Sequence, residues 1–343
     1  MRKLLNNLYI TQPDVNLGRD GKNIVIYQKG EKTQQFPVQY FENIICMNYT
    51  GMSPALMELC LENNVNITFL SQQGKIKARV VGHVTGNVLL RQEQFRIADD
   101  EARALEFARL FMHGKLYNSI QVLKRGIRDY PDAQFINELQ ETIDKLLNSK
   151  NNIGIVTNLA ELLGVEGDSS RNYFQVFDNL IVKQKSDFTF EKRVRRPPTD
   201  PTNAMLSLTY GMVRTLVESA LTTVGLDPFV GFFHQPRPGR TSLALDLMEE
   251  LRAYMADRFV LTLINRQQIK KEDFFRKESG AYLFTEESLK KYLNLWNKRL
   301  FDKITHPYLE EKIEIGLIPY TQAVLLARTI RGDLNLYPPF MMN

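Results

Sequence analysis

Three acidic residues and one histidine lie where the surrounding apolar pattern does not require a charge. Glu166 follows the apolar stripe of Leu159, Leu162 and Leu163, at the three- and four-residue spacing that continues this stripe on a helix. Its side chain is therefore expected to face protein or a cleft. Taken alone, a solvated carboxylate at the helix end beside Gly167 explains Glu166 better, because Glu is rarely buried without a partner.

The second group is a pair of acids in an almost unbroken apolar run, Thr241 to Arg258. Asp246 lies in mid-helix, where an unpaired charge is costly, and Glu249 lies one turn further on the same face. Two carboxylates at this spacing repel each other unless a cation lies between them, which favours a hard metal ion. A structural salt bridge to Arg252, or to an arginine of another helix, explains the pair equally well, so both interpretations stay open.

His234 precedes this run in a loop rich in Pro, Gly and Arg. A lone histidine in a loop is usually polar surface. Arg237 and Arg240, however, bracket a Pro-Gly turn just before the helix, whose first backbone N–H groups and dipole favour a phosphate. One segment therefore offers an imidazole, two acids and a predicted phosphate-binding position.

Further basic residues crowd the connection before Pro197-Pro198. They are Lys183, Lys185, Lys192, Arg193, Arg195 and Arg196. The 44 Lys and Arg exceed the 39 Asp and Glu, and the formal net charge of +5 is compatible with a polyanion partner without proving one. Charge runs are usually solvated faces, but cations grouped near a metal site suit a track for nucleic-acid backbone.

The elements that must position these residues change type along the chain. Short apolar runs between turn residues predict a β-rich start, with a hairpin at Asp20-Gly21 and one helix after Ser53-Pro54. From Asp99 onward the apolar spacing becomes helical, beginning with a long helix from Glu101 to Arg128.

The sequence thus predicts an α+β fold. A small β-rich domain is expected over residues 1–85, a linker over 86–99 and a larger all-α catalytic domain over 100–343. Within the helical part, separate helices are expected over 152–163 and 169–181, and one continuous helix over 241–258.

Composition and missing motifs exclude several classes of protein. Apolar residues at 43% and charged residues at 24% are ordinary for a soluble globular protein. No signal peptide and no apolar run of roughly 20 residues are present, so we expect a cytoplasmic protein without membrane contact. The two cysteines cannot form a disulfide framework, which indicates a reducing compartment. Motifs of nucleotide hydrolysis, dinucleotide binding, serine hydrolases and zinc sites are missing.

Three segments together resemble the CRISPR-associated adaptation integrases, the Cas one family. They are Gly164–Gly167 with Arg171–Phe174, Arg196–Ala204, and His234–Arg252. Each segment alone is a modest signal, but all three in this order after a β-rich start make a strong match over essentially the whole chain. The resemblance implies a small β domain followed by a helical catalytic domain. The subtype resembled is the one found with compact type I systems.

The resemblance also implies a site and its chemistry. Glu166, His234 and Glu249 would hold Mg²⁺ or Mn²⁺, with Asp246 in support, and it stays open whether Asp246 or Glu249 lies closer to the metal. The implied activity is a DNA endonuclease and integrase that inserts short DNA fragments as new spacers into a CRISPR array. The reaction is a transesterification in which a three-prime hydroxyl attacks a phosphodiester.

The implied partners are double-stranded DNA, a second copy of the chain and a small second CRISPR adaptation subunit. The residues expected to grip the DNA backbone are Arg171, Arg193, Arg195, Arg196, Arg237 and Arg240. Two other functions stay open. One is a metal-dependent nuclease of branched DNA that does not integrate, because water can attack at the same site. The other is a non-catalytic nucleic-acid-binding scaffold in which the acids form structural ion pairs.

Overall fold

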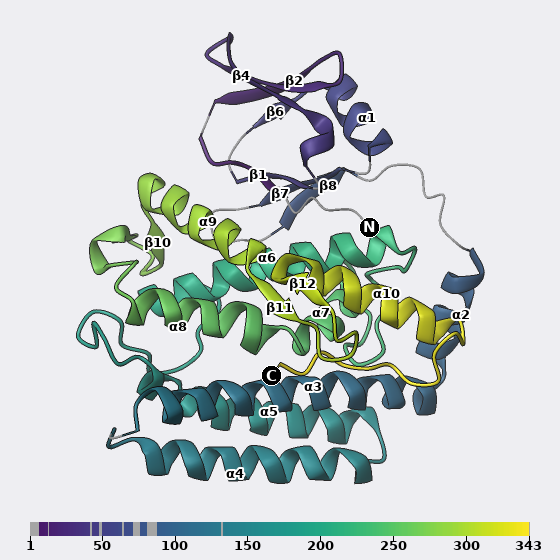
Figure 1. The fold of residues 1–343 in the computed structure, drawn as a ribbon, viewed down its shortest axis with the longest axis vertical. Coiled ribbons are helices and arrows are strands. Elements are labelled where there is room, and N and C mark those ends of the chain that lie inside the picture. The colour runs from purple at the N-terminus through teal and green to yellow at the C-terminus, as the bar shows by residue number, and fades with distance from the viewer. Residues whose placement is uncertain are drawn as a thin grey trace.

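A strand-rich N-terminal region lies against a larger helical region (Figure 1). The structure is a computed structural model, and it describes residues 7–12, 14–41, 43–47, 50–63, 65–70, 76–80, 88–131 and 133–342. Positions 81–87, which contain the predicted domain boundary and the start of the predicted linker, lie outside these ranges.

Eight strands form two four-stranded sheets in the N-terminal region. They are β1 (Asn7–Ile10), β2 (Val15–Asp20), β3 (Asn23–Gln28), β4 (Glu31–Pro37), β5 (Asn43–Cys46), β6 (Gly51–Met52), β7 (Asn66–Leu70) and β8 (Ile76–Val80). One sheet has the order β1-β5-β7-β8 and the other β4-β3-β2-β6. Their apolar faces share a core with helix α1 (Pro54–Glu62), in which the free thiols of Cys46 and Cys60 are buried. Ile45, Met47 and Leu70 face the helical region instead and join its core.

Local signals in this region are confirmed. Gly21 adopts a φ of +59° in the turn between β2 and β3, a conformation that costs glycine little. The Ser53 side chain accepts a hydrogen bond from the backbone N–H of Leu56 at 3.3 Å and so caps α1. Strand β2, the first arm of this predicted hairpin, buries only Val15 and Leu17 of its six residues.

Nine helices make up most of the described remainder. They are α2 (Val88–Asp99), α3 (Glu101–Asp129), α4 (Ile136–Asn152), α5 (Leu159–Gln175), α6 (Pro201–Thr223), α7 (Ser242–Glu249), α8 (Arg258–Asn265), α9 (Glu286–Phe301) and α10 (Ile318–Ile330). The long helix α3 packs against α4 and α5 and also contacts α7 (Figure 1). Helix α3 therefore lies between the two helices that carry the predicted acids.

Two expectations about the helical part need correction. Residues 88–99 of the segment predicted as a linker form helix α2, which packs on α3 and α10. Leu90 and Ile97 are buried on α2, and the buried Gln94 side chain donates to the carbonyls of Asp227 and Val230. The helical part is also not all-α. It contains two short hairpins, β9 (Phe274–Arg276) with β10 (Tyr282–Phe284) and β11 (Lys303–Thr305) with β12 (Lys312–Glu314). The α+β class itself is confirmed.

Helix breaks also differ from the prediction. Helix α5 continues through Gly164 and Gly167, because Leu162 and Tyr173 on either side of the two glycines are both buried in the same core. The expected single helix over 241–258 is instead α7, a π-helical turn over Arg252–Asp257 and then α8. Such π turns are frequent at functional sites, and this one begins three residues after Glu249.

Candidate active site

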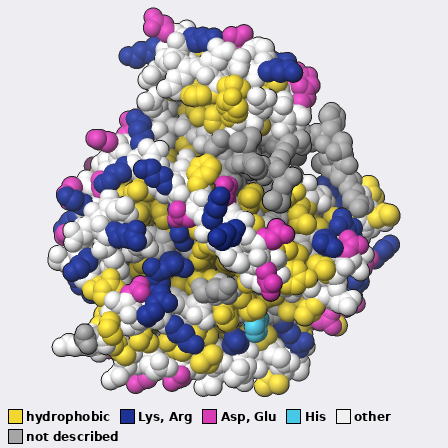
Figure 2. Space-filling view, in the orientation of Figure 1, with side chains coloured by type: hydrophobic (Ala, Val, Ile, Leu, Met, Phe, Trp, Pro, Cys, Tyr) yellow, Lys and Arg dark blue, Asp and Glu magenta, His cyan; other side chains and the backbone are white. Residues whose placement is uncertain are grey.

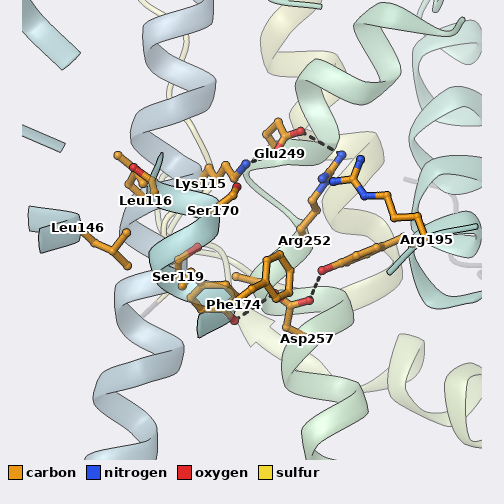
Figure 3. Close-up of a pocket in the computed structure, with 14 residues that line it drawn as sticks. Lys115, Leu116, Ser119, Leu146, Ser170, Phe174, Arg195, Glu249, Arg252 and Asp257 are labelled. Carbon is orange, nitrogen blue, oxygen red and sulfur yellow. Dashed lines mark hydrogen bonds and ion pairs between the residues drawn. The ribbon is translucent and has the colours of Figure 1, made fainter. Parts of the chain in front are cut away.

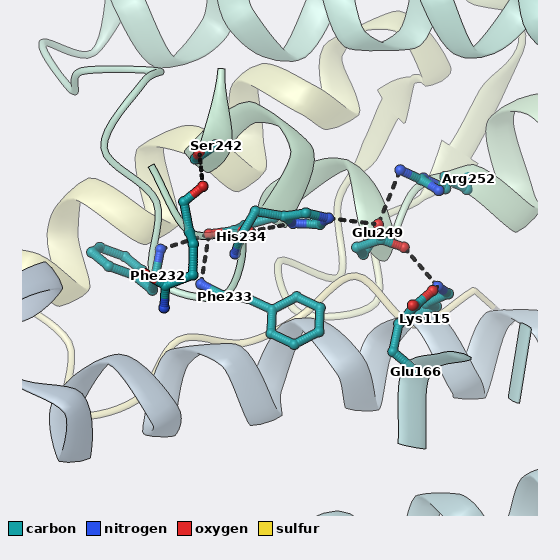
Figure 4. A network of polar contacts seen from close by, with 10 residues as sticks. Lys115, Glu166, Phe232, Phe233, His234, Ser242, Glu249 and Arg252 are labelled. Atoms are coloured by element: carbon teal, nitrogen blue, oxygen red, sulfur yellow. Dashed lines mark hydrogen bonds and ion pairs between the residues drawn. The ribbon is translucent and has the colours of Figure 1, made fainter. Parts of the chain in front are cut away.

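Glu166, His234 and Glu249 come together where α5, the loop before α7 and α7 itself face α3 (Figure 4). Nε2 of His234 lies 3.8 Å from Oε1 of Glu249. The ammonium of Lys115 on α3 contacts both carboxylates, Oε1 of Glu166 and, at 2.9 Å, Oε2 of Glu249. Three residues predicted from distant parts of the sequence therefore form one polar cluster.

Asp246 orients the histidine. It is fully buried, and its Oδ1 accepts hydrogen bonds from the backbone N–H of His234 at 2.8 Å and from the ring Nδ1 at 2.7 Å. Its Oδ2 accepts from the backbone N–H groups of Phe232 and Phe233 at 2.7 and 3.0 Å. Since a carboxylate only accepts, Nδ1 carries the proton and Nε2 is left facing Glu249.

These four hydrogen bonds also bear on the question of which acid lies nearer a metal. Both oxygens of Asp246 are engaged by the loop, whereas Glu249 lies near Nε2 of His234 and shares the ammonium of Lys115 with Glu166. The geometry therefore favours Glu249 as the closer acid and gives Asp246 a positioning role. Gly231 allows this arrangement, because a Cβ there would lie 2.7 Å from Oδ2 of Asp246 and 2.8 Å from the backbone nitrogen of Leu243.

Cations hold both clustered glutamates in the charged form. Burial alone would raise the pKa of Glu249, but the charges of Arg252 and Lys115 above all outweigh it and lower that pKa to about 2. Arg252 contacts Oε1 of Glu249 at 3.0 Å. Burial and the charge of Glu249 also raise the pKa of Glu166, yet Lys115 together with a hydrogen bond from Ser170 gives a net lowering. The predicted salt bridge between Glu249 and Arg252 is thus present.

The donor set fits a hard divalent ion. Two carboxylates and one imidazole nitrogen are ligands that Mg²⁺ and Mn²⁺ accept, and the imidazole is fixed by the hydrogen bond that its Nδ1 donates to Asp246. Over the ranges that the structure describes, no group of three or more His, Cys, Asp or Glu is already arranged around a common ion position. Lys115 lies between the carboxylates of Glu166 and Glu249 instead.

A small cavity of about 30 Å³ adjoins the cluster and reaches a second buried acid (Figure 3). Asp257 accepts hydrogen bonds from the hydroxyls of Tyr210 at 2.5 Å and Tyr173 at 3.0 Å. Burial raises the pKa of Asp257 to about 6, although these hydrogen bonds and the nearby arginines oppose the shift. The exposed Arg195 also lines the cavity, which places one predicted phosphate-binding residue next to the cluster.

The other predicted arginines divide into two groups. Arg196 and Arg237 are exposed and Arg240 is partly exposed, while Arg171 is exposed but paired with Asp168 at 3.1 Å. Arg193 instead points into the protein. It donates to Oδ1 of Asn203 at 2.7 Å and to Oγ of Ser207 at 3.1 Å, and it stacks on the Tyr210 ring. Its guanidinium is therefore not free to hold a phosphate, contrary to the prediction.

The predicted phosphate-binding position at the start of α7 is also wrong. The backbone N–H of Ser242 donates to the carbonyl of Arg240, and those of Leu243 and Ala244 donate to the carbonyl of Pro228. These N–H groups are therefore satisfied inside the protein. Other Lys and Arg side chains gather on the side of the helical region where α8, α9 and β10 lie (Figure 2).

Sequence reasoning missed Lys115 altogether. The signal was available, because Lys115 lies four residues after Phe111 and three after Met112, on the buried face of α3. A lone lysine on an apolar stripe needs a buried acidic partner. Tyr173, Tyr210 and Asp257 were also missed, since nothing in their spacing links α5 and α6 to the π turn.

The fold and the site together define a class of protein, one in which a strand-rich region precedes a helical region carrying two glutamates and a histidine in a single cluster. The family model for the CRISPR associated protein Cas1 matches residues 8–298. A CRISPR-associated endonuclease Cas1 of Rhodospirillum rubrum is 41% identical over 345 residues, covering 99% of this chain and 99% of the relative. The chain belongs to the Cas1 family.

Solved structures share the fold. A casposase bound to integration product has a TM-score of 0.83 at 24% identity, covering 100% of this chain and 95% of that one. A chain of a Cas6-RT-Cas1–Cas2 complex has a TM-score of 0.82 at 22% identity, covering 100% of this chain and 36% of that one. In the described part of the chain, no helix is both long and apolar enough to cross a membrane.

Proposed function

We propose that this protein is a metal-dependent DNA integrase and endonuclease that joins short DNA fragments to a CRISPR array as new spacers. Family membership supports this proposal, as does a relative named as an endonuclease. A casposase bound to integration product, which shares the fold, is consistent with it. The observation that carries the proposal is the convergence of Glu166, His234 and Glu249 on one cluster.

The carboxylates of Glu166 and Glu249 and Nε2 of His234 would hold Mg²⁺ or Mn²⁺. When bound, such an ion polarises a phosphoryl oxygen and favours ionisation of the attacking hydroxyl. The chain supplies the positioning. Asp246 fixes the ring of His234, and the partly buried Arg252 holds the carboxylate of Glu249 in place.

The proposed reaction is an exchange of phosphodiesters. The three-prime oxygen of the fragment attacks the phosphorus at the repeat boundary, a new P–O bond forms, and the P–O bond to the repeat strand's own three-prime oxygen breaks. That oxygen leaves and takes up a proton, so the number of phosphodiester bonds is unchanged. Lys115, Arg195 and Arg252, which adjoin the cluster, supply positive charge where a phosphate gains negative charge.

Double-stranded DNA is the proposed substrate, and the exposed guanidiniums of Arg195, Arg196 and Arg237 are the candidate contacts to its backbone. Arg240 and Arg171 are further candidates, the latter only if its pair with Asp168 opens. We further propose that a homodimer and a small second adaptation subunit complete the assembly in the cytoplasm. A related fold within a complex whose title includes Cas2 supports this second partner.

A strand-joining assay tests the proposal. Purified protein, the small partner subunit, a labelled fragment with a free three-prime hydroxyl and a repeat-bearing duplex are incubated with Mn²⁺. Joined product should form, and Glu166→Ala or His234→Ala should abolish it while DNA binding is retained, because neither side chain is a cation that binds phosphate. If the double variant still joined fragments, the site would be wrong.

The same assay separates the alternatives. A fragment whose three-prime hydroxyl is removed should give no joined product with an integrase. With a branched duplex added, a simple nuclease would cleave it equally well with either fragment and join neither. A scaffold would show no Mn²⁺-dependent product at all.

A further inference from the structure

Lys115 is a buried cation that two acids share. Lys115 is only 8% exposed, and its neighbours Phe111, Met112 and Leu116 on α3 lie in the apolar core. An ammonium in such a place is costly unless it is paired. Its pairing comes from Glu166 and Glu249, which belong to two other helices.

Lys115 in turn stabilises the two carboxylates. Arg252 reaches Glu249, and Ser170 donates to Glu166 at 2.8 Å, but neither group contacts both acids. Within the described ranges, Lys115 is the one cation in contact with both Glu166 and Glu249. Without it, two negative charges would face each other in a buried site, where their repulsion is weakly screened.

We propose that Lys115 is a built-in counter-cation, which holds the two metal-binding carboxylates together before a divalent ion arrives and which that ion must displace. The proposal rests on the proposed function, since it assumes that Glu166 and Glu249 hold the ion. Lys115 thereby lowers the affinity for metal and keeps the empty site folded. It sets the ion concentration at which the enzyme becomes competent.

The surroundings offer the displaced ammonium another place. The cavity of about 30 Å³ beside the cluster is lined by Lys115 itself and by the polar side chains of Ser119, Ser170 and Asp257 (Figure 3). Apolar side chains and the guanidiniums of Arg195 and Arg252 complete its wall, and a space of this size is large enough for a water-sized group. Asp257, Ser119 and Ser170 are the groups in this wall that could accept hydrogen bonds from a displaced ammonium.

Metal titration of the purified full-length chain tests this directly. Free Mn²⁺ is followed by electron paramagnetic resonance in the wild type, in Lys115→Met, which keeps the stem and removes the charge, and in Lys124→Met, an exposed lysine of the same helix. Lys115→Met should bind Mn²⁺ about tenfold more tightly or better, because a competing cation has been removed. Lys124→Met should bind as the wild type does.

Thermal unfolding supplies a second readout. In a chelator, Lys115→Met should melt below the wild type, and saturating Mn²⁺ should raise its melting temperature more than that of the wild type. Equal Mn²⁺ affinity and equal melting in the chelator would overturn the proposal for Lys115. Wild-type binding that Glu166→Gln does not weaken would instead overturn the metal site itself.

A measurement on the wild type covers the case in which Lys115→Met does not fold. With ¹⁵N-labelled lysine, a buried, paired ammonium gives an NMR signal protected from exchange with water. This signal should shift as Mg²⁺ saturates the site. A protected signal that stays unchanged at saturation would contradict displacement.

Discussion

Replacing Asp246 by Asn should be among the most damaging single-atom changes in this protein. The substitution removes a charge and keeps the shape of a fully buried side chain. The Asn side chain has one acceptor oxygen. Its NH₂ would face N–H groups that in the wild type donate to the second carboxylate oxygen of Asp246. Either the ring and backbone of His234 or the backbone of Phe232 and Phe233 lose their acceptor.

The magnitude follows from the number of bonds lost. Asp246 accepts four hydrogen bonds, of which Asn can keep two at most. Hydrogen bonds to a charged group contribute roughly 1.5–3 kcal/mol each, so the free energy of unfolding should fall by about 3–6 kcal/mol. This is a large part of the roughly 5–15 kcal/mol that stabilises a typical domain.

Urea unfolding measures this loss through the fluorescence of Trp296, the single tryptophan, which is buried in the helical core. Asp144→Asn, an exposed acid on α4, is the matched control and should change stability by less than about 0.5 kcal/mol. Strand joining by Asp246→Asn should also be lost at temperatures where the variant is folded. An Asp246→Asn protein as stable as the Asp144→Asn control would refute the reasoning.

Three further changes have expected outcomes. Glu218→Gln should lower the free energy of unfolding by about 3–5 kcal/mol, because the buried Glu218 pairs with Arg79 of β8 at 2.9 Å. A loss below about 1 kcal/mol in urea unfolding would show that this ion pair between the two regions is dispensable. Burial raises the pKa of Glu250 from 4.5 to about 8, so the folded state binds an extra proton in this window and stability should fall as pH rises through it, by up to roughly 1.4 kcal/mol per pH unit. Glu250→Gln should flatten this dependence, and equal slopes for wild type and variant would argue against a neutral buried acid. Arg196→Ala should weaken DNA binding and make the slope of log K against log salt concentration shallower by about one, the value for one phosphate contact. An unchanged slope between low and moderate salt would show that Arg196 does not contact DNA.

Glu166, Asp246 and Glu249 were noticed in the sequence because each interrupts a clear pattern, whereas the ligand set with His234 was implied by the family resemblance. Asp246 and Glu249 break an apolar run, and Glu166 extends a stripe that should be apolar. The strand-rich start and the change to helical spacing could also be predicted, because turn residues and caps such as Asp20-Gly21 and Ser53 act locally. These features depend on neighbours in sequence, which a sequence displays directly.

Features that depend on distant contacts were not predictable. Helix α2 has Gln94 in the middle of its buried stripe, and its amide finds acceptors in a loop far along the chain. Gly164 and Gly167 suggested a break, but packing of Leu162 and Tyr173 keeps α5 continuous. Arg193 looked like one of a solvated basic run, and only its contacts with α6 show that it faces inward.

Crystals of the wild-type protein soaked in Mn²⁺ and measured at the manganese absorption edge test the central claim most directly. We expect one strong anomalous peak bonded to Glu166, Glu249 and Nε2 of His234, and no such peak in Glu166→Gln crystals soaked in the same way. A peak held by other side chains, or no peak while these three remain paired with Lys115 and Arg252 at saturating Mn²⁺, would contradict it.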